Sequence, residues 1–127
     1  MIHGIEHIGV EVPDLDAAVG LFVGVLGFEL RFRGLGPDGT TPVAFVASGG
    51  LEFELFERGG VDAARLEHLA LRTDDVAAAG AELARHGVSA VSDEVQGMRG
   101  TRAILLDRAT TLGIRMHLST AGPGAGS

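Results

Sequence analysis

The chain has 127 residues, of which 46% are hydrophobic and 21% are charged. This length fits one domain, or two half-size units that share a core, and the apolar content excludes intrinsic disorder. The formal charge of −7 argues against nucleic-acid binding, because a phosphate backbone attracts clustered cations. No apolar run reaches the roughly 20 residues of a membrane span, and no signal-like leader is present, so we expect a soluble cytoplasmic protein.

Several reactive residue types are missing from the sequence. It contains no Cys, Tyr or Trp, and its ten basic residues are all Arg. Thiol nucleophiles, Cys-ligated metals, Schiff-base lysines and the phosphate-binding loop that requires Lys are therefore excluded. Catalysis must come from His, Asp, Glu, Arg, a hydroxyl group or a bound metal.

The sequence contains two copies of one module. A shift of 61 residues places segment 5–10 on 66–71, and a shift of 63 places segment 50–55 on 113–118. A net insertion of two residues between the matched blocks explains the change in offset, and loops accept such insertions at little cost.

Each copy has the pattern of a strand, a helix and three further strands. Apolar alternation predicts the strands, while Pro13-Asp14 and Gly27 bound a helical apolar spacing in the first copy. The expected elements are strand 5–12, helix 15–26, strands 29–35, 41–47 and 51–57, strand 65–73, a helix ending at His86, and strands near 88–96, 101–106 and 113–119. The sequence thus predicts one α+β domain over 1–120, made of two βαβββ modules at about 4–58 and 65–119, with a disordered tail at 121–127.

Four polar side chains are expected on the helix-free face of the strands, because neighbouring side chains alternate across a strand. They are His7, Glu54, His68 and His117. Two modules related by a pseudo-twofold axis would pair as a half-closed barrel and bring these groups into one cleft. Three imidazoles and a carboxylate are costly to bury without partners, so we expect a divalent metal there: zinc, nickel, cobalt, manganese or iron.

The motifs resemble those of the vicinal oxygen chelate superfamily, which includes glyoxalase I, methylmalonyl-CoA epimerase, extradiol dioxygenases and bleomycin-binding proteins. The similarity lies in H-I-G-V-x-V-P-D-L-D-A-A-V-x-x-F…L-G-F at 7–28 and its echo H-L-A-L-x-T-D-D-V-A-A-A…G-V at 68–88. It implies paired βαβββ modules, a homodimer and, in metal-dependent members, ligands on the first and last strand of each module. His7, Glu54, His68 and His117 fall on those places.

Two positions depart from the family pattern. Glyoxalase and epimerase members usually carry Glu where this chain has His117, so a bound divalent ion would keep a net charge of about +1 rather than about zero. The separate base of the epimerase, a Glu on the third strand, falls near Ala44 here.

Other polar residues flank the expected ligands. Glu52 and Arg115 are equivalent under the repeat, and we expect them to form a structural ion pair, although they could also orient ligands or receive substrate. Arg99 and Arg102, in and after a Gly-rich loop, are candidates to bind an anionic substrate group or are ordinary solvated arginines.

The resulting prediction is a metal-dependent, glyoxalase- or epimerase-like lyase or isomerase for a small oxygenated substrate, with enediolate chemistry assisted by the metal. Glu54 is the candidate base, and Glu52 replaces it if Glu54 is a permanent ligand. One alternative is an iron(II)-dependent dioxygenase with the same residues. Another is a non-catalytic binding or drug-resistance protein, although this chain lacks Trp and Tyr for stacking.

Overall fold

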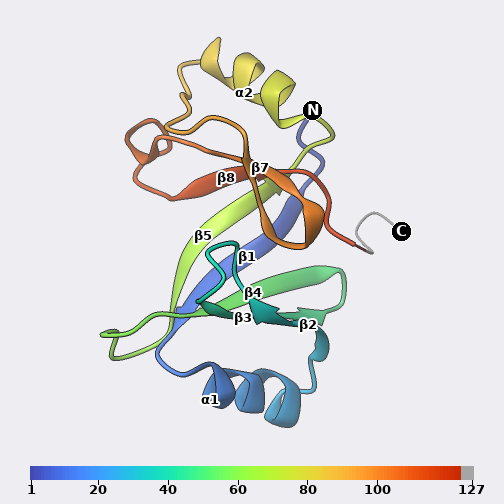
Figure 1. Ribbon diagram of the computed structural model, residues 1–127. Coiled ribbons are helices and arrows are strands. Elements are labelled where there is room, and N and C mark those ends of the chain that lie inside the picture. The colour runs from blue at the N-terminus through green and yellow to red at the C-terminus, as the bar shows by residue number, and fades with distance from the viewer. Residues whose placement is uncertain (124–127) are drawn as a thin grey trace. The chain divides into compact units, whose positions relative to one another are not determined.

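The computed structural model of the chain describes residues 1–123, which contain eight strands and two α-helices (Figure 1). In the first module these are β1 (Ile5–Val12), α1 (Leu15–Val19), β2 (Glu29–Leu35), β3 (Pro42–Ser48) and β4 (Leu51–Glu57). In the second they are β5 (Arg65–Arg72), α2 (Val76–Ala84), β6 (Val95–Gln96), β7 (Arg102–Leu105) and β8 (Met116–Ser119). The predicted α+β class with two βαβββ modules is confirmed. Of the predicted tail 121–127, residues 124–127 lie outside the described part.

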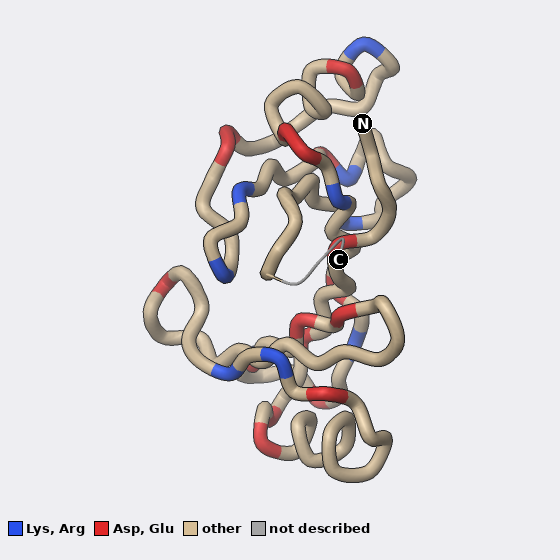
Figure 2. The backbone as a smooth tube through the Cα atoms, turned by 90° about the vertical axis from the view of Figure 1, so that its right-hand side faces the viewer, with Lys and Arg blue, Asp and Glu red and all other residues tan. Residues whose placement is uncertain are grey.

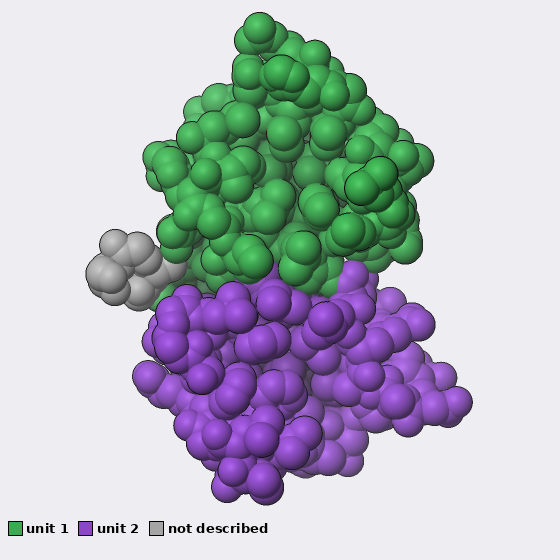
Figure 3. Space-filling model, turned by 180° about the vertical axis from the view of Figure 1, so that it is seen from behind, with its two compact units in different colours: residues 1–6, 68–127 green, residues 7–67 purple. Residues whose placement is uncertain are grey.

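The chain divides into two compact units that follow the repeat (Figure 3). Residues 7–67 form unit 2, and residues 1–6 with 68–127 form unit 1. The first module has the strand order β2-β3-β4-β1, and the second has the same order, β6-β7-β8-β5. In each module the first and last strands are parallel, while the other neighbouring pairs are antiparallel.

The strand register repeats the sequence duplication residue by residue. In the first module Ile8 lies opposite Phe53, and Gly9 lies opposite Glu54. In the second module Leu69 lies opposite Met116, and Ala70 lies opposite His117. These pairs are related by the same shifts of 61 and 63 residues that align the sequence, so the duplication extends to the hydrogen-bonded ladder.

The core of the first module lies between the sheet and its helix. Val10 and Val12 of β1 pack with Leu15 of α1 and with Leu55 of β4. These strand residues are on the face predicted to bury, because apolar side chains at every second position share one side of a strand. The helix begins at Asp14, whose carboxylate accepts a hydrogen bond from the Ala17 amide at 3.2 Å.

The first helix differs from the prediction in its second half. After α1 the chain continues as a π-helix over Gly20–Val25 instead of an α-helix to residue 26. Two glycines in this segment weaken the α-helical preference, and the wider turn accompanies packing of Phe22 against Phe28 and Phe53, with ring centroids 5.3 and 5.9 Å away. Packing therefore compensates for the weak local propensity.

The second module repeats this arrangement with a smaller sheet. Asp75 caps α2, accepting from the Ala78 amide at 3.0 Å, and Val76 packs against Ile104 and Leu118. Its last strand is shorter than predicted. Leu112 and Gly113 have φ values of +60° and +84°, so the chain turns there instead of extending from residue 113.

Charged residues of both signs are interspersed along the chain rather than collected by sign (Figure 2). Glu11 on β1 illustrates the pattern: its fully buried carboxylate forms ion pairs with Arg58 and Arg65 at the two ends of the segment that joins the modules. This cluster ties the connecting segment to β1.

Candidate functional site

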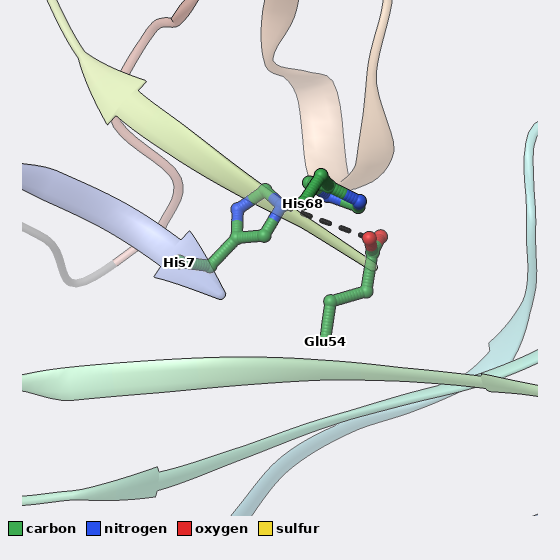
Figure 4. A group of neighbouring side chains, drawn as sticks. All are labelled: His7, Glu54 and His68. Carbon is green, nitrogen blue, oxygen red and sulfur yellow. Dashed lines mark ion pairs between the residues drawn. The ribbon is translucent and has the colours of Figure 1, made fainter. Parts of the chain in front are cut away.

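The first half of the candidate site consists of His7 on β1 and Glu54 on β4, both in unit 2. Parallel pairing sets Glu54 opposite Gly9, two residues along β1 from His7, and Gly9 has no side chain to separate them. The two side chains point toward one another (Figure 4), with His7 Nε2 3.6 Å from Glu54 Oε1. Only 12% and 13% of these side chains are exposed, so the pair is largely withdrawn from solvent.

Aromatic rings surround this pair on one side. The His7 imidazole meets Phe45 of β3 edge to face, with centroids 5.7 Å apart, and Phe45 in turn meets Phe32 of β2 at 6.1 Å. Apolar rings lower the local dielectric, so a charge on Glu54 or on a ligand acts more strongly here than in water. The predicted placement of both side chains on the face opposite the helix is consistent with this contact, since Phe45 lies directly across from Glu54.

A second carboxylate, Glu52, lies two residues along β4 and is 7% exposed. Arg31 of β2 reaches it, with Nη1 3.3 Å from Oε2, and Arg31 Nε lies 3.6 Å from an oxygen of Glu29. The β2–β3 register shifts between Leu30 and Phe32, so Arg31 is the extra residue of a β-bulge. A bulge interrupts side-chain alternation, which lets Arg31 extend toward Glu52.

The role of Arg31 is not predictable from the sequence, because nothing in the apolar alternation of β2 marks a bulge. The predicted Glu52–Arg115 ion pair joins residues of different units and stays a prediction.

The position assigned to the family's separate base does not offer a proton-transfer group. Ala44 on β3 is fully buried and belongs to the same core as Val10 and Leu55. It therefore lies on the helix-facing side of the sheet, and proton transfer must use other residues.

The second half of the candidate site consists of His68 on β5 and His117 on β8, both in unit 1. Their rings are stacked, with centroids 4.1 Å apart and planes inclined by 18°. A metal binds imidazole in the ring plane at about 2.0–2.1 Å from nitrogen. Two rings stacked in this way share no in-plane point within that distance of both nitrogens, so one of them must rotate before both can bind one ion.

Three arginines were singled out near this half of the site. The backbone of Arg115 continues the β5 ladder by accepting from the Leu69 amide at 3.0 Å, and Arg115 and His117 are among the residues that line a cavity. Arg102 lies 3.3 Å from Glu94, and Arg99 occupies a left-handed turn with φ of +58°. Arg108, in the loop after β7, also lines this cavity, and its guanidinium donates to the Gly113 carbonyl. No periodic pattern in the sequence marks this residue.

Comparison with known families identifies the chain. Residues 4–112 match the sequence model of the Glyoxalase/Bleomycin resistance protein/Dioxygenase superfamily. The chain belongs to this superfamily. The match covers most of both modules and confirms the resemblance found in the strand and helix motifs.

The most similar relatives include several epimerases. Human mitochondrial methylmalonyl-CoA epimerase is 26% identical over 92% of this chain and 73% of its own length. A solved structure of a variant Streptomyces coelicolor methylmalonyl-CoA epimerase with 2-nitronate-propionyl-CoA is 25% identical, with a TM-score of 0.84 over 95% of this chain and 99% of that one. Methylmalonyl-CoA epimerase from Mycobacterium tuberculosis shares the fold, with 21% identity and a TM-score of 0.85 over 96% and 90% of the two chains.

These relatives confirm the prediction of an epimerase-like isomerase of this family. Among residues 1–123 no helix is long and apolar enough to cross a membrane. The homodimer, the cytoplasmic location and the lyase and dioxygenase activities stay predictions.

Proposed function

We propose that this chain is a metal-dependent epimerase that inverts the carbon next to the carbonyl of a short acyl-CoA thioester. In this proposal His7, Glu54, His68 and His117 are the metal ligands, two from each module. The substrate class comes from the relatives, which include an epimerase solved with methylmalonyl-CoA and 25% identical to this chain.

The observation that carries the proposal is the pair of donor groups within the first module, where His7 Nε2 lies 3.6 Å from Glu54 Oε1 and both side chains are largely buried. Imidazole and carboxylate are donors that suit zinc, nickel, cobalt, manganese or iron. We propose that His68 of the second module completes this donor set. His117 would be the fourth ligand after rotation of its stacked ring.

A bound divalent ion would supply Lewis acidity toward the oxygens of the substrate. The chain itself must move the proton. Glu54 is the candidate base if its bond to the ion is labile, because its carboxylate lies 3.6 Å from His7, and an apolar ring, Phe45, packs against that histidine. Glu52, held by Arg31, offers a second carboxylate on the same strand for the case in which Glu54 stays bound to the ion.

Metal binding is tested by elemental analysis of protein loaded with nickel or zinc and then freed of excess ion. We expect one ion per chain in the wild type and less than a tenth of that in His7→Ala and His68→Ala, because each change removes one of the nitrogen atoms proposed to bind the ion. His86→Ala is the matched control, since His86 is 70% exposed and lies 3.3 Å from Glu82. Full occupancy in either His7→Ala or His68→Ala would contradict the ligand assignment.

Catalysis is tested with methylmalonyl-CoA in deuterated water. Epimerisation through proton removal exchanges the proton on the substituted carbon, and proton NMR then shows the methyl doublet collapse to a singlet. We expect exchange with metal-loaded protein and none after treatment with a chelator. Exchange that is equally fast in chelated protein would refute the metal requirement, and absence of exchange in loaded protein would refute the substrate class.

A further inference from the structure

A small cavity lies beside His117, entirely within the second module. Its volume is about 130 Å³, and its lining includes the apolar residues Val91, Leu105, Leu106 and Met116. An apolar cavity of about 150 Å³ binds benzene, so this one has room for a chain of about three or four carbons. Pockets for drug-sized ligands usually measure about 300–1,000 Å³, so only a fragment of a substrate fits here.

The first module places a larger side chain at one of the equivalent positions. Leu105 lies opposite His117 on the neighbouring strand, as Phe45 lies opposite Glu54. Residues paired in this way share one face of a sheet, so Leu105 is the counterpart of Phe45. In the first module the Phe45 ring packs against two further rings, with centroids 5.7 and 6.1 Å away. The shorter leucine leaves more space beside His117.

Val91 differs from its counterpart in the same direction. The residue before Val91 forms a bridge with Leu106, and the residue before Arg31 pairs with Val46. Because Leu106 and Val46 directly follow the counterparts Leu105 and Phe45, Val91 is equivalent to Arg31. The Arg31 side chain extends as far as a carboxylate on β4, with Nη1 3.3 Å from it, whereas valine has no such reach. Two of the apolar lining residues are therefore smaller than those of the first module.

The charged residues of the lining do not require a ligand. Arg108 donates from Nε and Nη2 to the Gly113 carbonyl, at 3.2 and 2.9 Å. Asp107 Oδ1 accepts from the Ala109 amide at 3.0 Å, and Arg115 is exposed to solvent. A bound group need not supply charge, so the cavity selects by size and by apolar contact.

We propose that this cavity binds the alkyl substituent on the carbon that the enzyme inverts, with Leu105 as the specificity-determining residue. His117 is a proposed metal ligand and lines the cavity, so a group held there is close to the reacting part of the substrate. A methyl group would leave much of the space empty, whereas about three or four carbons would fill it and bury more apolar surface. The inference rests on the proposed function and adds a preference for substituents larger than methyl.

Primary alcohols test the cavity directly, because they carry an alkyl chain without the rest of an acyl-CoA. Ethanol, 1-propanol and 1-butanol are titrated into the metal-free full chain while the side-chain methyl NMR signals of Val91, Leu106 and Met116 are followed. We expect binding to strengthen about fourfold with each added carbon, as burial of one CH₂ group provides. Equal binding of the three alcohols, or shifts confined to other residues, would overturn the proposal.

Two variants fill the cavity independently. Leu105→Phe introduces the side chain of the first module, and Val91→Phe enlarges a residue that is 63% exposed and can change without displacing the core. Each should abolish the gain with chain length. Leu112→Phe is the matched control, because it makes the same exchange in the same module at a residue that is 95% exposed. Persistence of the gain in either folded, filled variant would overturn the assignment of the alkyl site to this cavity.

Substrate selectivity is measured by deuterium exchange of methyl-, ethyl- and propylmalonyl-CoA with metal-loaded protein. In the wild type kcat/KM should rise about fourfold with each added carbon, because the longer substituent is buried in the transition state. In Leu105→Phe it should fall as the substituent grows, while the metal content stays that of the wild type. The same ranking of the three thioesters in both proteins would overturn the role of Leu105.

Failure of this inference can be separated from failure of the proposed function. Exchange of methylmalonyl-CoA without any effect of chain length, for alcohols or for thioesters, overturns the alkyl site alone. Binding of alcohols with the expected gain but no exchange of any thioester overturns the proposed function and leaves the apolar preference of the cavity standing.

Discussion

Removing the arginine partners of Glu11 should destabilise the protein more than removing the charge of Glu11 itself. The carboxylate is fully buried, whereas the side chains of Arg58 and Arg65 are 55% and 71% exposed. In Glu11→Gln both arginines can be solvated by water, and the screened pairs contribute only about 1 kcal/mol to the free energy of unfolding. In Arg58→Met/Arg65→Met a buried carboxylate loses both partners, which costs about 3–5 kcal/mol.

Urea denaturation at pH 7 measures these differences, because urea adds no ionic screening. The same difference can be followed by thermal unfolding. For a chain of this length about 1 kcal/mol corresponds to a shift of roughly 4 °C in Tm, so the double arginine variant should melt at least about 10 °C below the wild type. Adding Glu11→Gln to that double variant should recover part of the loss, because it removes the uncompensated charge. The reasoning is refuted if the double variant is no less stable than Glu11→Gln.

Two further predictions concern loops. The pKa of Asp38 lies well below its usual range, because the Thr41 hydroxyl and the amides of Thr41 and Thr40 donate to its carboxylate. Its ionised form therefore stabilises the fold fully above the unfolded pKa of about 3.9, and this stabilisation decreases as the pH falls below that value. The urea midpoints of the wild type and Asp38→Asn should differ at pH 6 and converge toward pH 2. A difference that stays constant with pH would contradict this explanation. Leu112 is 95% exposed with φ of +60°, so Leu112→Asn should raise the unfolding free energy by about 0.5–1 kcal/mol in urea, because Asn tolerates the left-handed region. Leu112→Ala keeps the unfavourable conformation and serves as control; an equal gain there would refute the explanation.

The sequence by itself determined the duplicated architecture. Alternating apolar residues specify which face of β1 packs against the helix, and the shifts of 61 and 63 residues relate the pairing of Ile8 with Phe53 to that of Leu69 with Met116. The helix start at Asp14 was also predictable from the sequence, and the second start was narrowed to Asp74 or Asp75, of which the structure selects Asp75. Capping can be predicted in this way because it is a local interaction within a few residues of the chain.

Only the tertiary structure decided how individual side chains are presented. The bulge at Arg31 depends on the neighbouring strand, and the stacking of His68 on His117 depends on the contacts that select their rotamers. The shortened β8 and the cavity beside it follow from a loop whose hydrogen bonds join residues that carry no periodic signal. Periodicity describes a regular element in isolation, whereas bulges, rotamers and irregular loops are settled by packing between elements.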